Sequence, residues 1–116
     1  MFSPKIEEYR FGYIVIDGRS YSSDVIIHAQ GVEPDWWRMQ GHSLSPHDVK
    51  SILDRNPEIL VVGTGGSGMM VVTEETRRLI RHLGIQLVVE RTQRACHTYN
   101  RLSPSKRTVA ALHLTC

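Results

Sequence analysis

Residues 58–68 read Glu-Ile-Leu-Val-Val-Gly-Thr-Gly-Gly-Ser-Gly and carry more information about this chain than any other stretch. An apolar run, Ile59 to Val62, opens directly into residues 63–68, which hold four glycines in six positions. A short apolar run that ends in glycines is typical of a buried strand followed by a tight turn. At the carboxyl end of a sheet strand, such a turn can direct backbone N–H groups at an anion. We therefore expect a strand here, with a candidate ligand-binding turn after it.

On both sides of this stretch the chain alternates between helix and strand patterns. Ser45-Pro46-His47-Asp48 predicts a helix start with Ser45 as the N-cap. Thr73 predicts a second helix start, and Gly84 is expected to end that helix. Three further segments follow: a strand over 85–90, a helix over about 93–102 capped by Thr92, and a final strand over 109–114. This alternation predicts an α/β fold with a partly parallel sheet and helices packed on it.

The first part of the chain is rich in strand signals. Residues 12–18 predict a strand that ends in an Asp17-Gly18 turn, and Tyr21 together with Asp24 to His28 predicts a second one. Together they indicate a β meander or hairpin as an additional N-terminal layer. Residues 29–46 are rich in loop signals, and Trp36-Trp37-Arg38 within them is compatible with a short strand. We expect one tryptophan in the core and the other packed under a loop.

Composition places the chain among ordinary globular domains. With 116 residues, of which 41% are hydrophobic and 22% charged, residues 1–116 are expected to form a single domain. The two cysteines, Cys96 and Cys116, form no CxxC pair, which is typical of a reduced cytosolic protein. No run of 18 apolar residues is present, and the N-terminus, Met1 to Lys5, lacks the apolar core of a signal sequence. A cytoplasmic protein without a membrane span is expected.

The charges are unevenly distributed although the net charge is only +2. Residues 1–76 hold six basic and eleven acidic residues, whereas residues 77–116 hold eight basic residues and one acid, Glu90. Eleven of the fourteen basic residues are arginine, which binds phosphates and carboxylates through two parallel hydrogen bonds. The two halves can also pack together and compensate each other's charge. Because no aromatic or known binding motif accompanies the basic half, nucleic-acid binding is not expected.

The glycines match the spacing of the G-x-G-x-x-G pattern of dinucleotide-binding proteins, but the residues around them do not fit that fold. Glu90 follows at the expected distance for a ribose-binding acid. In the dinucleotide fold, however, the helix begins inside the glycine motif, whereas here the apolar residues 69–72 precede the Thr73 cap. A Walker A motif is excluded because Gly68 is not followed by Lys-Ser/Thr. No cofactor is therefore expected, and the glycines are interpreted either as loop geometry or as a pocket for a small anion.

A small set of side chains could complete an anion site at the glycine turn. The Thr64 hydroxyl and the N–H groups of the turn would hold the anion, Arg38 would supply the opposite charge, and Asn100 and His113 would form polar walls. The turn residues concerned are Gly65, Gly66, Ser67 and Gly68. The alternative for Asn100 is a helix cap, and for His113 it is a histidine with its hydrogen bonds satisfied within a strand.

Chemistry beyond binding has little support in the sequence. The six histidines show no metal-ligand spacing, so no metal site is expected. Cys96 is interpreted as core filler, although a nucleophilic pair with a distant histidine stays open. No catalytic constellation is recognised.

Segments spread over nearly the whole chain match one known family. They are Phe11 to Ile16, Gly18, Tyr21, Asp24 to Ile27, Trp37-Arg38, Gly41-His42, Leu44, Ile59 to Gly65, Leu83 to Ile85, Thr92, Ala95, Tyr99-Asn100 and Arg107 to Cys116. Together they resemble a prokaryotic domain of unknown function that is similar to the mitochondrial assembly factor (type 3) of respiratory complex I and to an adipogenesis-associated vertebrate protein. The resemblance implies a three-layer fold whose central mixed sheet has its last strand antiparallel to the rest. It implies no reaction, and the mitochondrial relative points to partner binding.

Two functions follow from these observations. The first, which we favour, is a non-catalytic protein-binding or assembly adaptor for an unknown protein partner, anchored by Trp36 or Trp37 and by Met69-Met70. The second is a small-molecule or anion-binding protein, with or without enzymatic activity, whose site is the Gly63–Gly68 turn. The sheet edges that this topology leaves are also compatible with a homodimer.

Overall fold

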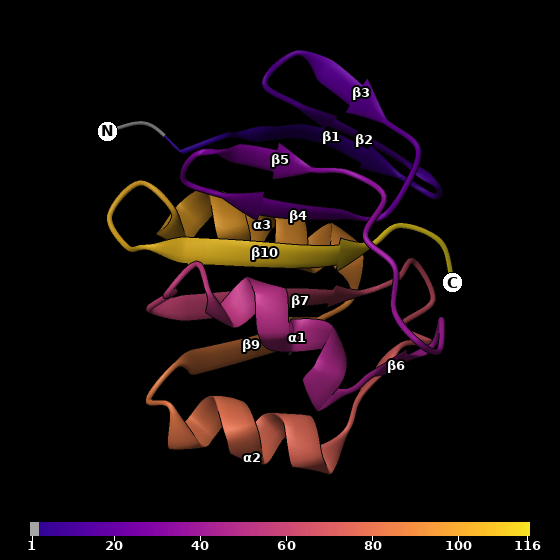
Figure 1. Ribbon diagram of the computed structural model, residues 1–116. Helices are drawn as coiled ribbons and strands as arrows, with labels where there is room; N and C mark the ends of the chain where they lie inside the picture. The colour runs from indigo at the N-terminus through magenta and orange to yellow at the C-terminus, as the bar shows by residue number, and fades with distance from the viewer. Residues whose placement is uncertain (1–2) are drawn as a thin grey trace.

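The structure is a computed structural model that describes residues 3–116. Met1 and Phe2, which begin the N-terminal segment considered above, lie outside the described residues. Figure 1 shows how the helices and strands are arranged. They are β1 (Ile6–Arg10), β2 (Tyr13–Ile16), β3 (Arg19–Tyr21), β4 (Val25–His28), β5 (Gly31–Glu33), β6 (Ser43–Leu44), α1 (Pro46–Leu53), β7 (Ile59–Thr64), β8 (Val71–Val72), α2 (Glu74–His82), β9 (Gln86–Glu90), α3 (Thr92–Leu102) and β10 (Thr108–His113).

A five-stranded mixed sheet in the order β5-β4-β10-β7-β9 forms the centre of the molecule. Figure 1 shows this sheet with α1 in front of it and α3 behind it. The sheet divides the core accordingly: one hydrophobic cluster packs under α1 and α2, and the other lies among α3, β1 and β2. The N-terminal strands form a separate antiparallel sheet, β1-β2-β3. The predicted three-layer α/β architecture with an N-terminal β layer is thus confirmed.

The direction of the last strand differs from the expectation. β10 runs parallel to β7, which runs parallel to β9. The strand that points the other way is β4, which is antiparallel to both of its neighbours, β10 and β5. The cause is α3, because a helix that connects two strands of one sheet returns the chain to the end where the first strand began. The expected antiparallel last strand is therefore wrong.

The N-terminal layer contains one strand more than predicted. β1, which the sequence patterns did not indicate, pairs antiparallel with β2. The predicted turn at Asp17-Gly18 is confirmed, with φ angles of 48° and 79° that suit a tight hairpin. The second predicted strand region divides in two, because β3 stays in the hairpin layer while β4 leaves it to pair with β10.

The two adjacent tryptophans do not form a strand. The chain leaves extended geometry at Asp35, whose φ is +57°, and follows an irregular path through Trp36-Trp37-Arg38. Trp36 is 8% exposed and belongs to the core cluster under α1, as expected for one of the pair. Trp37 is 84% exposed, so the expectation that it packs under a loop is wrong.

Local capping signals place the helices well. The Asp48 carboxylate accepts hydrogen bonds from the N–H and hydroxyl of Ser45 at 2.9 and 2.8 Å, which stabilises the start of α1. Thr73 caps α2 by accepting from the Thr76 N–H, and Gly84 follows the helix end with a φ of +75°. Thr92 differs from its predicted role, because α3 already begins at this residue and Arg91 occupies the N-cap position.

The central strands β7 and β10 are buried along their whole length. Both faces of the sheet are covered around them, which explains why they read as continuous apolar runs rather than alternating ones. Within residues 3–116, no helix combines the length and the apolar character needed to cross a membrane.

Candidate functional site

Two of the predicted site residues meet at the carboxyl end of β10. His113 is the last residue of β10, and Arg38 lies in the loop between β5 and β6. Arg38 Nη2 lies 3.1 Å from His113 Nδ1, although 75 positions separate the two residues in sequence. Their side chains are 4% and 7% exposed, so the contact is buried. Thr64 lies next to His113 in the parallel pairing of β7 with β10.

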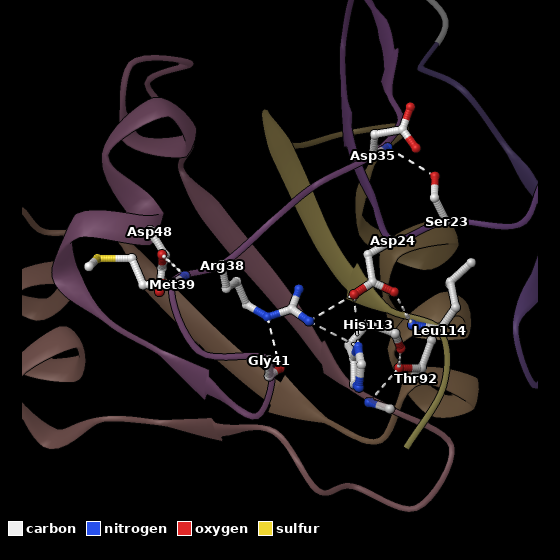
Figure 2. A network of polar contacts seen from close by, with 11 residues as sticks. Ser23, Asp24, Asp35, Arg38, Met39, Gly41, Asp48, Thr92, His113 and Leu114 are labelled. Atoms are coloured by element: carbon white, nitrogen blue, oxygen red, sulfur yellow. Dashed lines mark hydrogen bonds and ion pairs between the residues drawn. The ribbon is translucent and has the colours of Figure 1, made fainter.

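Asp24, which the sequence patterns did not single out as a site residue, completes this cluster (Figure 2). Its Oδ2 accepts a hydrogen bond from Arg38 Nη2 at 2.8 Å and lies 2.8 Å from His113 Nδ1. Its Oδ1 accepts from the Leu114 N–H at 2.7 Å. Arg38 also donates through Nε to the carbonyl of Gly41 at 3.1 Å. One carboxylate thus holds the loop and the end of β10 together.

The protonation of this cluster follows from its hydrogen bonds. Burial alone would raise the pKa of Asp24, but hydrogen bonds from His113, the Leu114 N–H and Arg38 outweigh it and hold the pKa below its usual value. Asp24 is therefore ionised, and the proton between its Oδ2 and Nδ1 of His113 belongs to the ring. In the neutral ring this tautomer leaves Nε2 as a hydrogen-bond acceptor. Arg38 and His113 are then two donors to one carboxylate.

A cavity of about 520 Å³ opens beside the cluster, and we call it the Trp37 pocket. Its lining combines polar Asp24, Arg38 and His113 with the rings of Trp36 and Trp37. The guanidinium carbon of Arg38 lies 4.6 Å from the centroid of the Trp36 ring, a cation–π contact that helps to fix the loop. Aromatic walls with a few convergent polar groups are typical of small-molecule sites.

Three nitrogen atoms of residues that line the Trp37 pocket are buried without a hydrogen-bond partner within residues 3–116: Trp36 Nε1, Arg38 Nη1 and His113 Nε2. Leaving such a group unpaired costs about 1–3 kcal/mol, and folded proteins contain few of them. All three residues line this one cavity, and the three atoms have no partner from the described part of the chain. Two of them, on Trp36 and Arg38, can only donate, so the missing partners must include acceptor atoms.

The glycine turn next to this cluster uses most of its backbone donors internally. The N–H groups of Gly65, Gly66 and Gly68 donate to Thr92 Oγ1, the Thr115 carbonyl and the Gly65 carbonyl, at 2.8, 2.6 and 3.2 Å. β7 continues through Thr64, so the turn begins later than predicted. These three N–H groups are therefore not free to hold an anion, contrary to the expectation. Those of Gly65 and Gly66 bind the start of α3 and the segment that follows β10, and that of Gly68 closes the turn on itself.

The side chains and carbonyls of the turn are also engaged. The Thr64 hydroxyl donates to the Glu90 carbonyl at 3.2 Å, and the Ser67 carbonyl accepts from Arg91 Nη2 at 3.2 Å. Thr92 Oγ1 in turn donates to the His113 carbonyl at 2.6 Å. The turn thus connects β7, α3 and β10. Through Thr92 it also fixes the backbone of His113, which belongs to the Asp24–Arg38–His113 cluster.

Asn100 lies apart from the other predicted site residues. Its amide nitrogen donates to the Ile6 carbonyl at 2.7 Å, and its oxygen accepts from the Ile6 N–H at 3.0 Å. The side chain therefore acts as a pairing partner for the outer edge of β1 and attaches the N-terminal layer to α3. It is neither a wall of the Trp37 pocket nor a helix cap.

The family of the chain follows from comparison with known proteins. The model of the family described as protein of unknown function (DUF498/DUF598) matches residues 6–114. The chain belongs to this family. The resemblance to a domain of unknown function is therefore confirmed, whereas the likeness to the complex I assembly factor stays an expectation.

Solved structures of similar proteins share the fold of this DUF498/DUF598 chain. A conserved hypothetical protein from Pyrococcus horikoshii is 31% identical with a TM-score of 0.86, and the match covers 97% of this chain and 99% of that one. A protein from Bordetella parapertussis is 25% identical with a TM-score of 0.82, over 97% and 96% of the two chains. A Bordetella pertussis protein described as a Mth938-like domain is 23% identical with a TM-score of 0.68, over 96% and 85%, and shows the same fold.

Cys96 does not supply a reactive thiol to the site in this DUF498/DUF598 protein. Cys96 lies on the buried face of α3, and burial raises the pKa of its thiol to about 12. At neutral pH the thiolate that a nucleophilic cysteine requires is therefore absent. The site residues offer hydrogen-bond donors on Arg38 and Trp36 and the ring nitrogen Nε2 of His113.

Proposed function

We propose that this protein binds a small molecule that carries a carboxylate group, in the Trp37 pocket. The observation that carries the proposal is the set of three buried, unpaired nitrogens on Trp36, Arg38 and His113. A carboxylate offers acceptors to both Arg38 Nη1 and Trp36 Nε1, and charge-assisted bonds of this kind are stronger than neutral ones. The exposed ring of Trp37 would cover the apolar part of the ligand.

The pairing with Asp24 favours a carboxylate group over a more highly charged anion. Asp24 already neutralises Arg38 through the 2.8 Å bond to Nη2, so the cluster carries no large excess of positive charge. A ligand with several negative charges would be repelled by the carboxylate of Asp24. A single carboxylate loses little to this repulsion and gains two buried hydrogen bonds.

Arg38→Met should reduce carboxylate binding by about tenfold or more, because it removes the charged donor while keeping the length of the side chain. We would screen small carboxylic acids against the folded protein and follow the Trp36 indole N–H and the amides of residues 36–41 by NMR. Trp37→Ala, at a surface position, should weaken binding without affecting the fold. Arg19→Met, on an exposed residue of β3, is the control for the loss of one positive charge and should leave binding unchanged.

The same screen has outcomes that would contradict the proposal. Shifts confined to Gly65–Gly68 would move the site to the glycine turn, in agreement with the earlier hypothesis for that segment. Absence of any saturable shift at the Trp36 indole with the whole set of acids would remove the Trp37 pocket from consideration.

Partner binding is a second candidate function, and exposed apolar side chains favour it. Trp37, Met39, Met69, Val71 and Phe11 are all more than half exposed. Two of their segments, around Phe11 and around Met69, bind the same C-terminal segment: the N–H groups of Gly12 and Met69 donate to the carbonyls of Leu114 and Cys116. Large exposed apolar groups that gather at one site are typical of interaction surfaces. The resemblance to an assembly factor agrees with an adaptor role.

Met69→Asp should weaken association with a partner, or self-association, by about tenfold or more without unfolding the protein. Met69 is 53% exposed, so a charge at this position costs little in the isolated chain. Leu83→Asp is the matched control, because Leu83 is 51% exposed and follows α2 away from these segments. Light scattering and pull-down would measure the effect, and equal association of the Met69→Asp variant and the unmodified protein would argue against this surface.

A further inference from the structure

β9 is an end strand of the central sheet with an open pairing edge. The Gln86 N–H donates to the Glu58 carbonyl at 3.0 Å, so Gln86 directs its backbone groups toward β7. Because these groups alternate along a strand, Leu87 and Val89 direct theirs away from β7. β9 is the last strand on this side, and no other strand among residues 3–116 pairs with that edge.

Several features that usually prevent strand pairing are absent from β9, although α2 contacts the strand on one face of the sheet. Leu87, Val88 and Val89 are apolar and only half-buried. No lysine or proline interrupts them, and the register with β7 is continuous over all five residues of β9, so no bulge is present. Natural proteins rarely leave a regular apolar edge of this kind without protection. An edge that stays open is typical of recognition by strand addition.

Arginines flank the edge on both faces of the sheet. A groove of about 770 Å³ beside α3 is lined by Arg91, Arg94, His97 and Arg101, together with Glu90, Gln93 and Thr98, and we call it the α3 groove. On the opposite face, Arg77 and Arg81 of α2 lie beside Leu87. We call the five arginines on the two faces the arginine rim of β9; they are Arg77, Arg81, Arg91, Arg94 and Arg101.

The arginines of this rim have no acidic partners in the part of the chain that the structure describes. The salt bridges there involve Arg10, Arg38, Arg55 and Arg107, and none involves a rim arginine. Arg77 and Arg91 donate only to the carbonyls of Val72 and Ser67. Several unpaired guanidinium groups produce a positive field that attracts carboxylates.

We propose that β9 pairs with an extended, acidic segment of a partner protein. The backbone of the segment would bond to the outward N–H and carbonyl groups of Leu87 and Val89. Its Asp or Glu side chains on one face would enter the α3 groove and meet Arg94 and Arg101. A second copy fits this edge less well, because pairing two β9 strands would bring two sets of unpaired arginines together. The proposal is independent of the Trp37 pocket. That pocket lies beside β4 and β10, whereas β9 is the strand at the opposite end of the sheet.

The test uses a short synthetic peptide in which Glu alternates with Val. NMR titration of the full protein should show saturable amide shifts at Leu87 and Val89, and the affinity should fall with added salt. The double variant Arg94→Glu/Arg101→Glu should bind about tenfold more weakly or worse. The double variant Arg19→Glu/Lys50→Glu changes the net charge equally at exposed positions outside the groove, and it should bind as the unmodified protein does.

Peptide variants separate strand pairing from simple charge attraction. The same peptide N-methylated at the residues that face β9 should lose binding, since its N–H groups can no longer reach the strand. A peptide with Lys in place of Glu should not bind. Equal binding of the N-methylated peptide, or equal losses in the two double variants, would overturn the proposal. A stable homodimer in the free protein with protected Leu87 and Val89 amides would overturn it as well, because the second copy would then occupy the edge.

Discussion

Replacing Asp24 with alanine should lower the free energy of unfolding by about 3–5 kcal/mol. Asp24 receives hydrogen bonds from Arg38 and the Leu114 N–H and pairs with His113, and all three lie in the buried cluster. The Arg38 side chain is 4% exposed, so loss of the carboxylate leaves a charge without compensation away from water. Removing one partner of a buried pair costs more than the pair itself contributes, because the remaining ion is still desolvated.

A double variant distinguishes this mechanism from a general packing defect. Asp24→Ala/Arg38→Met removes both charges, and it should recover a large part of the stability that Asp24→Ala loses. Urea unfolding of the three proteins measures the effect. Their unfolding midpoints can be compared directly when the free energy of unfolding depends equally steeply on urea in all three. A loss of less than about 1 kcal/mol in Asp24→Ala would mean that Arg38 finds another partner or water when the carboxylate is absent.

The Asp24 carboxylate also makes the free energy of unfolding depend on pH in the acidic range. The pKa of Asp24 is lowered in the folded state, so its contribution is present above the unfolded pKa of about 3.9. The contribution is lost as the pH falls below that value and through the lower folded pKa. Unfolding midpoints between about pH 5 and pH 2 should therefore fall less steeply in Asp24→Asn than in the unmodified protein. Asp48, whose pKa is also lowered, serves as a comparison through Asp48→Asn.

Gly65→Ala is expected to destabilise the protein by roughly 3–5 kcal/mol. A Cβ atom at this position would lie 2.3 Å from the carbonyl carbon of Cys116 and 2.8 Å from the Thr115 oxygen. Neither atom can move freely, because the Thr115 and Cys116 carbonyls accept from the N–H groups of Gly66 and Met69. The φ of Gly65 is +107°, which adds backbone strain for any residue with a side chain.

Gly18→Ala is the matched control for this substitution. Gly18 also has a positive φ, +79°, but an added Cβ would meet no atom within 4 Å. It should therefore cost only about 1 kcal/mol, from backbone strain alone. The difference between the two variants in thermal or urea unfolding measures the close approach of the Gly65 turn to the segment after β10. Equal losses would mean that this segment moves aside at little cost.

The sequence predicted two residues of the Asp24–Arg38–His113 cluster but not the third. Arg38 and His113 were expected near one another and do lie in contact, although the turn that was to bring them together is engaged elsewhere. Asp24 was read only as the start of a strand. Its role depends on pairing with a residue 89 positions later, and no local pattern encodes such a distance. An aspartate directly before an apolar strand was the one signal that could have drawn attention to it.

Local physical chemistry determined the α/β class, the helix starts at Ser45 and Thr73, the turn at Asp17-Gly18 and the buried strand β7. These features depend on caps, turn geometry and hydrophobic spacing. Each of these acts over a few neighbouring residues, so the local sequence is enough to predict it. Only the tertiary structure decided the parallel direction of β10, the exposure of Trp37 and the use of the glycine N–H groups. Each of these depends on which distant segments pack side by side, because a backbone donor or a ring is free or occupied according to its neighbours in space.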